Sequence, residues 1–413
     1  MKILHTADWH LGKRLEQFQR LEEQKEVLAE ICEIAERENV DAVIVAGDLF
    51  DNFSPGSDAT ELLYTTLHRL SDGGRRAVVA IAGNHDSPER INVPDALARA
   101  CGILCVGFPN ATISTFETTA GLKVTKTDFG FVELKLPRCA TPLRLILTPY
   151  ANEVRLKTFL GVENPEQSLR DALQNHWQNL ANIYCDTAGV NLLVAHLFMM
   201  SRGGEMPEEP DDERSILHIG GAQAIFADNV PPQIQYVALG HLHRHQTIAR
   251  QPCPMVYSSS PLAYSFAEAN QTKYVIIIKA EANQAVDYEA IELKKGKKLL
   301  RKKIESVDEA VDWLTAHTDA LVQITMLTDD YLKTADKKRL IDAHPYLMPI
   351  VPELKSQEAS QASRQLVDLQ SQTIEELFVD YFKSQKENKG QKPSDSLLDL
   401  FREITALPDH DSN

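Results

Sequence analysis

The sequence predicts an α/β protein in which two sheets pack as a sandwich with helices outside, followed by a small α+β unit and two terminal helices. Three observations predict it. Short runs rich in Val, Ile and Leu alternate with amphipathic stretches up to about residue 280. After Met255, strand patterns follow one another without helices between them, which favours a second, more antiparallel sheet. The chain of 413 residues is also long enough for two or three domains.

The first part of the chain supplies the elements of this sandwich. Short apolar runs predict buried strands at Ile3–Leu4, Ala42–Ala46, Ala77–Ala82, Leu143–Thr148, Asn191–Ala195 and Tyr236–Leu239. In Glu22–Glu38 and Pro165–Tyr184 apolar residues recur at helical spacing, which predicts helices with one buried face. The segments 273–281 and 285–293 are typical of further strands.

A basic stretch opens the second part of the chain. Lys294–Lys303 has seven basic residues in ten, and strand, helix, strand, helix and strand patterns follow it. Ser306 and Glu309 form a capping box for the first of these helices. The predicted domains are 1–293 for the sandwich, 294–352 for a small capping domain, 353–372 for a Gln/Ser-rich linker and 373–413 for a helix pair.

Composition excludes several classes of protein. No run approaches about 18 consecutive apolar residues, so a membrane-spanning helix is excluded, and the N-terminus has no signal-peptide pattern. Six scattered cysteines without a CxxC pair indicate a reduced, cytoplasmic chain. The formal net charge of −16 argues against binding nucleic acid through overall charge, so any such binding depends on local cations or basic clusters.

Polar side chains follow five of the predicted strands directly. They are Asp8 and His10, Asp48 and Asp51, Asn84 and His85, His196, and His241 with His243. Ligands of open α/β sheets bind outside the carboxyl ends of the strands, so we expect these side chains to converge. Three neighbouring residues of less specific context, Trp9, Asp86 and His245, are assigned structural roles.

The donor types predict a pair of metal ions. Carboxylate, imidazole and amide donors without cysteine suit Mn²⁺, Fe²⁺ or Zn²⁺, and seven of them are too many for one ion. Two ions are the usual arrangement for hydrolysis of phosphate esters, and the carboxylate of Asp48 is the candidate bridge between them. With a bridging hydroxide, such a site has a net charge of about +1, which attracts a phosphate diester.

These motifs resemble those of the calcineurin-like metallophosphoesterases. The matching residues are Asp8-x-His10, Gly47-Asp48-x-x-Asp51, Gly83-Asn84-His85-Asp86, His196 and Gly240-His241-x-His243. Within that superfamily, the N-terminal HTADWHLGK and the overall layout resemble the SbcD family of bacterial nucleases, over essentially the whole chain and including the segment YSSSPLAYSF. The resemblance implies a four-layer αββα metallophosphoesterase sandwich.

The resemblance also implies how the site is divided. One ion is implied at Asp8, His10, Asp48 and His243, and the other at Asp48, Asn84, His196 and His241. His85 is implied as the catalytic histidine outside the metal shell, and we expect the carboxylate of Asp51 to orient it. Ala195 and Ser259 stand where the family commonly has glycine, and a local backbone shift at Ser259 is expected.

Cofactors, partners and activity follow from the same resemblance. It implies manganese, an SbcC-like coiled-coil ATPase, a homodimer, and cleavage of double-stranded DNA from its ends and of single-stranded DNA internally. We expect the dimer at helices near Ser57–Leu70 and Pro94–Ala100, through Leu62, Leu63, Leu67 and Leu97. The terminal helix pair, with its apolar stripes, is expected to dock the ATPase in the nucleoid-associated complex.

Two other kinds of function remain open. A small-substrate phosphodiesterase or a protein phosphatase uses the same kind of site, although Asn52 and Asp86 stand where the phosphatase pattern has Arg and Glu. A DNA-end tether with an inactive site is the non-enzymatic alternative, and the complete ligand set disfavours it. The chain contains no GxxxxGK[ST] loop, so ATP is assigned to the partner.

Overall fold

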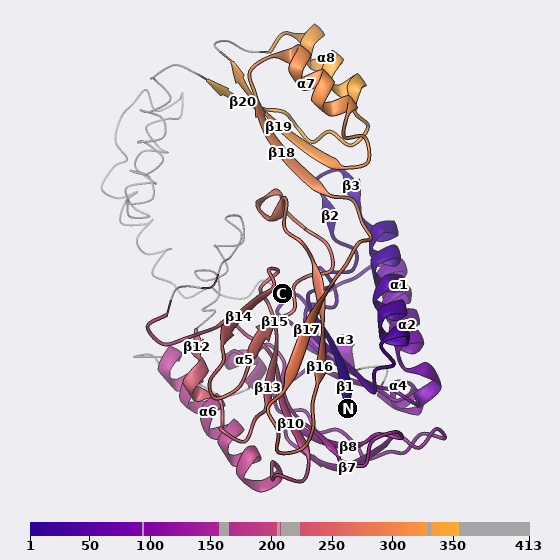
Figure 1. The fold of residues 1–413 in the computed structure, drawn as a ribbon, viewed down its shortest axis with the longest axis vertical. Helices are drawn as coiled ribbons and strands as arrows, with labels where there is room; N and C mark the ends of the chain where they lie inside the picture. The colour runs from indigo at the N-terminus through magenta and orange to yellow at the C-terminus, as the bar shows by residue number, and fades with distance from the viewer. Residues whose placement is uncertain (93–94, 157–164, 205–206, 208–223, 329–331, 355–413) are drawn as a thin grey trace, which may run out of the picture. The chain divides into compact units, whose positions relative to one another are not determined.

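The computed structural model describes residues 1–92, 95–156, 165–204, 207, 224–328 and 332–354 (Figure 1). The chain divides into two compact units. One consists of 1–302, 315–323 and 344–349, and the described part of the other consists of 303–314, 324–328, 332–343 and 350–354. The predicted boundaries at 293, 352 and 372 stay predictions, and the terminal helix pair lies outside the described residues.

The first sheet has six strands in the order β17-β16-β1-β4-β5-β6. Their bounds are Asp287–Glu292, Tyr274–Lys279, Lys2–Thr6, Ala42–Ala46, Ala77–Ile81 and Ile103–Val106. The four strands from β1 to β6 run parallel, while β16 lies antiparallel to β1 and β17 antiparallel to β16. The four parallel strands therefore place the carboxyl ends of β1, β4 and β5 side by side.

The second sheet has seven strands in the order β14-β15-β13-β10-β9-β8-β7. Their bounds are Gln246–Ala249, Met255–Tyr257, Tyr236–Gly240, Val190–His196, Leu143–Thr148, Phe131–Lys135 and Lys123–Asp128. The prediction that the strands after Met255 form a sheet of their own is wrong. β15 pairs parallel to β13, whereas β16 and β17 extend the first sheet, because strand pairing depends on partners far away in the sequence.

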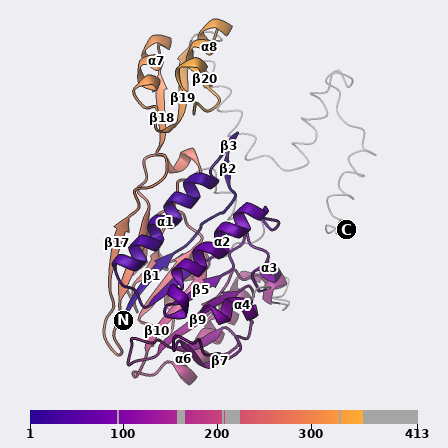
Figure 2. The ribbon, with the colours of Figure 1, turned by 90° about the vertical axis from the view of Figure 1, so that its right-hand side faces the viewer.

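Helices cover both outer faces, which gives the predicted four layers (Figures 1 and 2). α1 (Leu21–Arg37) and α2 (Ser57–Leu70) pack on the first sheet, and α6 (Pro165–Tyr184) packs on the second. Side chains alternate along each strand, so Val43 and Val45 face the helices while Ile44 and Ala46 face the other sheet. The core therefore consists of three apolar layers.

The predicted face of the first helix is confirmed. Val27, Leu28, Ile31, Ile34 and Ala35 are all buried in α1, as their spacing requires. The remaining short elements are β2 (Arg14–Leu15), β3 (Phe18–Gln19), η1 (Asp72–Gly74), α3 (Pro88–Asn92), α4 (Asp95–Ala100), α5 (Glu153–Leu156), β11 (Met199–Met200), β12 (Ile225–Phe226), η3 (Ala227–Asn229) and η4 (Phe266–Glu268).

The predicted order of strand, helix, strand, helix and strand after the basic stretch is confirmed. The elements are β18 (Leu299–Ile304), α7 (Val307–Thr315), β19 (Leu321–Thr328), α8 (Thr334–Ala343) and β20 (Val351–Leu354), and the strands form one sheet in sequence order. In the second unit, Ala310 and Leu314 of α7 and Leu340 of α8 are buried with Ile324 and Met326 of the sheet. This small α+β unit therefore has an apolar interior of its own.

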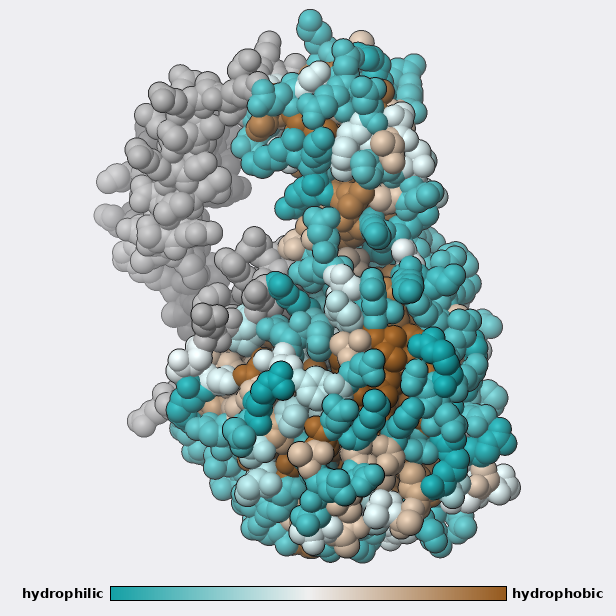
Figure 3. Space-filling model, viewed as in Figure 1, coloured by the Kyte–Doolittle hydropathy of each residue, from teal (hydrophilic) through white to brown (hydrophobic). Residues whose placement is uncertain are grey.

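The face of the molecule in Figure 3 is predominantly hydrophilic, with apolar side chains in scattered places. Within the described residues, no helix has the length and hydropathy to cross a membrane. None of the six cysteines, all of them in described residues, forms a disulfide.

Candidate metal centre

The five predicted strand ends meet at one place, at the junction of the two sheets. Asp8 and His10 follow β1, Asp48 follows β4 and Asn84 follows β5, all in the first sheet. His196 ends β10, and His241 and His243 follow β13 in the second. The loops after β1 and β4 are joined by main-chain hydrogen bonds from Asp8 N to Gly47 O (3.0 Å) and from His10 N to Asp48 O (2.9 Å).

The backbone around the site adopts conformations that L-residues rarely use. Asp8, His10, Asp48 and His241 have φ values of 55°, 44°, 47° and 107°. Such conformations cost free energy and persist where the surroundings fix them, which is frequent at functional sites. The same holds at Ser259, where φ is 100°, so this serine keeps a conformation that glycine favours.

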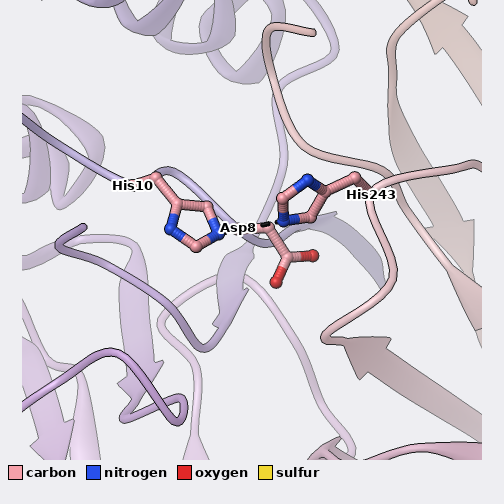
Figure 4. A group of neighbouring side chains, drawn as sticks. All are labelled: Asp8, His10 and His243. Carbon is pink, nitrogen blue, oxygen red and sulfur yellow. Dashed lines mark hydrogen bonds between the residues drawn. The ribbon is translucent and has the colours of Figure 1, made fainter. Parts of the chain in front are cut away.

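One group of side chains consists of Asp8, His10 and His243 (Figure 4). The Nε2 atoms of His10 and His243 lie 3.0 Å apart. Two imidazole nitrogens at this distance repel unless a proton or a cation lies between them. Asp8 Oδ2 and His10 Nδ1 are buried and have no hydrogen-bond partner among the described residues. A buried carboxylate oxygen without a donor suits a cation.

A second group surrounds Asp48. His196 Nε2 lies 3.3 Å from Asp48 Oδ2 and 3.0 Å from Asn84 Oδ1, and His241 Nδ1 lies 3.1 Å from the same amide oxygen. His10 Nε2 lies 3.6 Å from Asp48 Oδ2, so one carboxylate adjoins both groups. All seven predicted ligand residues are therefore brought together, and the Asp48 carboxylate lies between the two groups.

At this buried site, burial and the neighbouring charged groups shift the pKa values of the side chains in opposite directions. Burial disfavours the Asp48 carboxylate, but His196 and His10 outweigh it and hold its pKa well below the usual range. Burial likewise opposes a charge on His196, yet Asp48 and Asp8 raise its pKa to about 9. Burial raises the pKa of Asp8 to about 6. Cation binding must therefore compete with protons at this site.

His85 lies beside the two groups, but the predicted contact with the Asp51 carboxylate is wrong. The Nδ1 atom of His85 lies 2.9 Å from the main-chain oxygen of Asp51. The carboxylate instead lies 3.3 Å from Lys13 Nζ and 3.8 Å from His10 Nδ1. The direction of the loop after Asp48 decides this, since it turns the carbonyl of Asp51 toward the ring. His10, Asp51 and His85 also form a group with metal-ligand spacing.

Asp86, Trp9 and His245, which were assigned structural roles, make hydrogen bonds within the protein. Both Asp86 oxygens accept main-chain hydrogen bonds, from Leu49 (3.0 Å), Gly83 (2.8 Å) and Phe50 (2.8 Å). Trp9 is buried and donates to Thr6 Oγ1, and His245 Nδ1 lies 2.9 Å from Tyr257 O.

Sequence reasoning missed three residues that support the site. The buried guanidinium of Arg155 donates to the carbonyls of Gly83 (2.7 Å) and Asp86 (2.8 Å), which holds the GNHD turn. Glu268 and Lys273 are buried beside His243. Neither Arg155 nor Glu268 belongs to a strand-end motif. The YSSSPLAYSF resemblance pointed toward Glu268 and Lys273, which follow that segment, and no signal in the sequence pointed to Arg155.

Comparisons with known proteins agree with this geometry. The family model described as calcineurin-like phosphoesterase matches residues 1–245, and the chain belongs to that family. It is 34% identical, over 98% of both chains, to the D subunit of nuclease SbcCD from Bacillus subtilis (strain 168). It is 28% identical to the same subunit from Escherichia coli (strain K12), over 92% of this chain and 91% of the relative. The SbcD family is therefore the branch in which the chain lies.

Proposed function

We propose that this chain is the metal-dependent nuclease subunit of an SbcC–SbcD-like complex and hydrolyses phosphodiester bonds of DNA. The observation that carries the proposal is the convergence of seven ligand-type side chains from two sheets, with the Asp48 carboxylate beside both His196 and His10. Relatives named as nucleases support DNA as the substrate.

The proposed ligands are the predicted ones. Asp8, His10, Asp48 and His243 hold one ion, and Asp48, Asn84, His196 and His241 hold the other. The carboxylate, imidazole and amide donors fit divalent ions such as Mn²⁺, and so does Asp8 Oδ2, which has no hydrogen-bond partner in the described part of the chain. When bound, such ions polarise the phosphate oxygens and lower the pKa of water, which supplies a nucleophile near neutral pH.

The protein's own contribution is acid catalysis and positioning. We assign His85, which is half-buried, to stabilise or protonate the departing oxygen of the scissile bond. The main-chain oxygen of Asp51 accepts a hydrogen bond from Nδ1–H, so Nε2 is the atom that acts on the departing oxygen, and it donates a proton there when the ring is the doubly protonated imidazolium. Asp51 is in this proposal a positioning residue that acts through its backbone.

The partners are also part of the proposal. We assign an SbcC-like coiled-coil ATPase, double- and single-stranded DNA, and a homodimer within a nucleoid-associated cytoplasmic complex. Leu63 and Leu67 are buried in their own chain, which leaves Leu97, 75% exposed on α4, and the half-buried Leu62 for the dimer surface. A stable monomer at micromolar concentration in sedimentation would contradict the dimer.

The decisive experiment is cleavage of plasmid and hairpin DNA with Mn²⁺, beside a cyclic nucleotide and a phosphopeptide. Asp48→Asn should abolish DNA cleavage, whereas Asp58→Asn, on the exposed side of α2, should leave it unchanged. Preferential hydrolysis of the cyclic nucleotide or phosphopeptide would favour the alternative enzymes. DNA binding without any hydrolysis would indicate the inactive tether.

A further inference from the structure

Behind the candidate metal centre lies a fully buried carboxylate that no motif predicts. Glu268 ends η4 and has no exposed surface. Its Oε1 lies 3.3 Å from His243 Nδ1 and accepts a hydrogen bond from Tyr264 N at 3.0 Å. Its Oε2 pairs with the ammonium of Lys273. Both carboxylate oxygens are therefore engaged within the protein.

Lys273 contacts the same histidine at its main chain. Its ammonium is buried and donates to the main-chain oxygen of His243 (2.9 Å) and to Ser260 Oγ (2.9 Å). Glu268 thus contacts the ring of His243, and Lys273 contacts its backbone. Because these partners follow His243 by 25 and 30 residues, the contacts join the GHLH loop to the segment that leads into β16.

This arrangement determines which ring nitrogen can bind a cation. A carboxylate at Nδ1 favours a proton there and leaves the lone pair on Nε2. Nε2 of His243 is the atom that faces His10, in the group with Asp8 (Figure 4). His196 differs, because its Nδ1 is held by the main-chain oxygen of Ala46 at 2.9 Å.

A buried ion pair gives little net stability by itself, because both charges lose their hydration. Net stability therefore does not explain why the Glu268–Lys273 pair is buried against the candidate ligand His243. We propose that Glu268 and Lys273 are positioning residues that fix His243 as its Nδ1–H tautomer and present Nε2 to the ion shared with Asp8 and His10. This inference rests on the proposed function, since it assigns a supporting pair to one of the two proposed metal sites.

The tautomer can be measured without any variant of the pair and without metal. In the full chain labelled with ¹⁵N-histidine, the nitrogen shifts and couplings of His243 report which nitrogen has the proton. Resonances that disappear in His243→Gln identify the ring. We expect a protonated Nδ1 and a bare Nε2 in the metal-free protein. The opposite tautomer would overturn the proposal.

A matched pair of variants tests the consequence for metal binding. Glu268→Gln should weaken Mn²⁺ binding at one of two sites by about 10- to 100-fold in calorimetric titration, the usual effect of losing such a partner. Glu133→Gln is the control, because Glu133 also pairs with a buried cation, Arg144 at 2.8 Å, but lies on β8 outside the candidate metal centre. It should bind Mn²⁺ within about twofold of the original chain.

The possible results distinguish failure of this inference from failure of the proposed function. If Glu268→Gln binds Mn²⁺ like the control while His243→Gln loses one site, the positioning role is wrong and the proposed ligands stand. If the unaltered chain binds no Mn²⁺, the proposed function fails. Should Glu268→Gln not fold, the double variant Glu268→Gln/Lys273→Met removes both charges and serves in its place, and the tautomer of the unaltered chain still decides.

Discussion

Gly83 makes room for the proposed bridging carboxylate. A Cβ atom built at this position would lie 2.1 Å from Asp48 Oδ1 and 2.3 Å from Asp48 N, far inside van der Waals contact. Gly47 is similarly restricted, because its Cβ would lie 2.1 Å from His196 Nδ1. The glycines of the GDxxD and GNHD motifs are therefore required by close approach of the site's own side chains.

The Gly83→Ala substitution should accordingly displace Asp48. We expect Mn²⁺-dependent DNA cleavage to fall by at least about 100-fold, because a misplaced reacting group commonly costs that much. Gly56→Ala is the control, since nothing lies within 4 Å of a Cβ at Gly56. Cleavage rates at saturating Mn²⁺ measure the effect, and equal rates for the two variants would contradict the steric explanation.

The backbone contact of His85 gives a different prediction for Asp51. Because the main-chain oxygen makes that contact, Asp51→Asn should leave His85 in place and reduce cleavage less than about tenfold. His85→Asn should reduce it by about 100-fold or more, the range of a general acid. Single-turnover cleavage compares the two. A similar loss in both would mean that the carboxylate itself acts on His85.

At the scale of elements, the two sheets are joined by a buried histidine. His5 of β1 is fully buried, and its Nδ1 lies 3.2 Å from Tyr236 Oη while its Nε2 lies 3.1 Å from Leu239 O, both on β13. Burial lowers the pKa of His5 to about 3. In the folded protein His5 is therefore a neutral imidazole near neutral pH.

This gives a stability change with a defined sign. The folded pKa lies below the unfolded value of 6.5, so the unfolded chain binds the proton first and stability falls as the pH drops from 6.5 toward 3. Between pH 7 and 5 this loss is about 2 kcal/mol. Urea unfolding of His5→Gln should show a pH effect smaller by that amount. His68→Gln, exposed on α2, should show the original pH effect, and an unchanged effect in His5→Gln would contradict the assignment.

At the scale of the whole molecule, the candidate centre needs both sheets. Asp8, Asp48 and Asn84 come from the first sheet, whereas His196, His241 and His243 come from the second. The main-chain N–H of His241 donates to Asp8 Oδ1 at 2.9 Å, which links the two sets. The geometry of the site therefore depends on the packing of one sheet against the other.

The proposed complex with the ATPase gives a prediction for the full chain. Residues 373–413, which lie outside the described residues, have two apolar stripes in the sequence and follow a Gln/Ser-rich segment. Truncation after Ser371 should abolish binding of the coiled-coil ATPase and preserve Mn²⁺-dependent cleavage by the isolated chain. Copurification and nuclease assays measure the two effects. Binding of the partner at full affinity by the truncated chain would refute the docking role.

The sequence by itself determined the class of fold, the strand ends that form the site and the face of α1. Such features depend on residues near one another in the chain, whose spacing and side-chain chemistry are visible directly. A helix near Ser57–Leu70 was expected together with the dimer surface, and α2 has these bounds.

Only the tertiary structure showed that β15 pairs in the second sheet and that β16 and β17 pair in the first. It also showed which atom of Asp51 contacts His85 and which residues support the site. Arg155 reaches Gly83 across 72 residues of sequence, and β1 pairs with β16 across most of the chain. Pairings at such distances are selected by packing of the complete molecule, because many partners are compatible with the same local pattern.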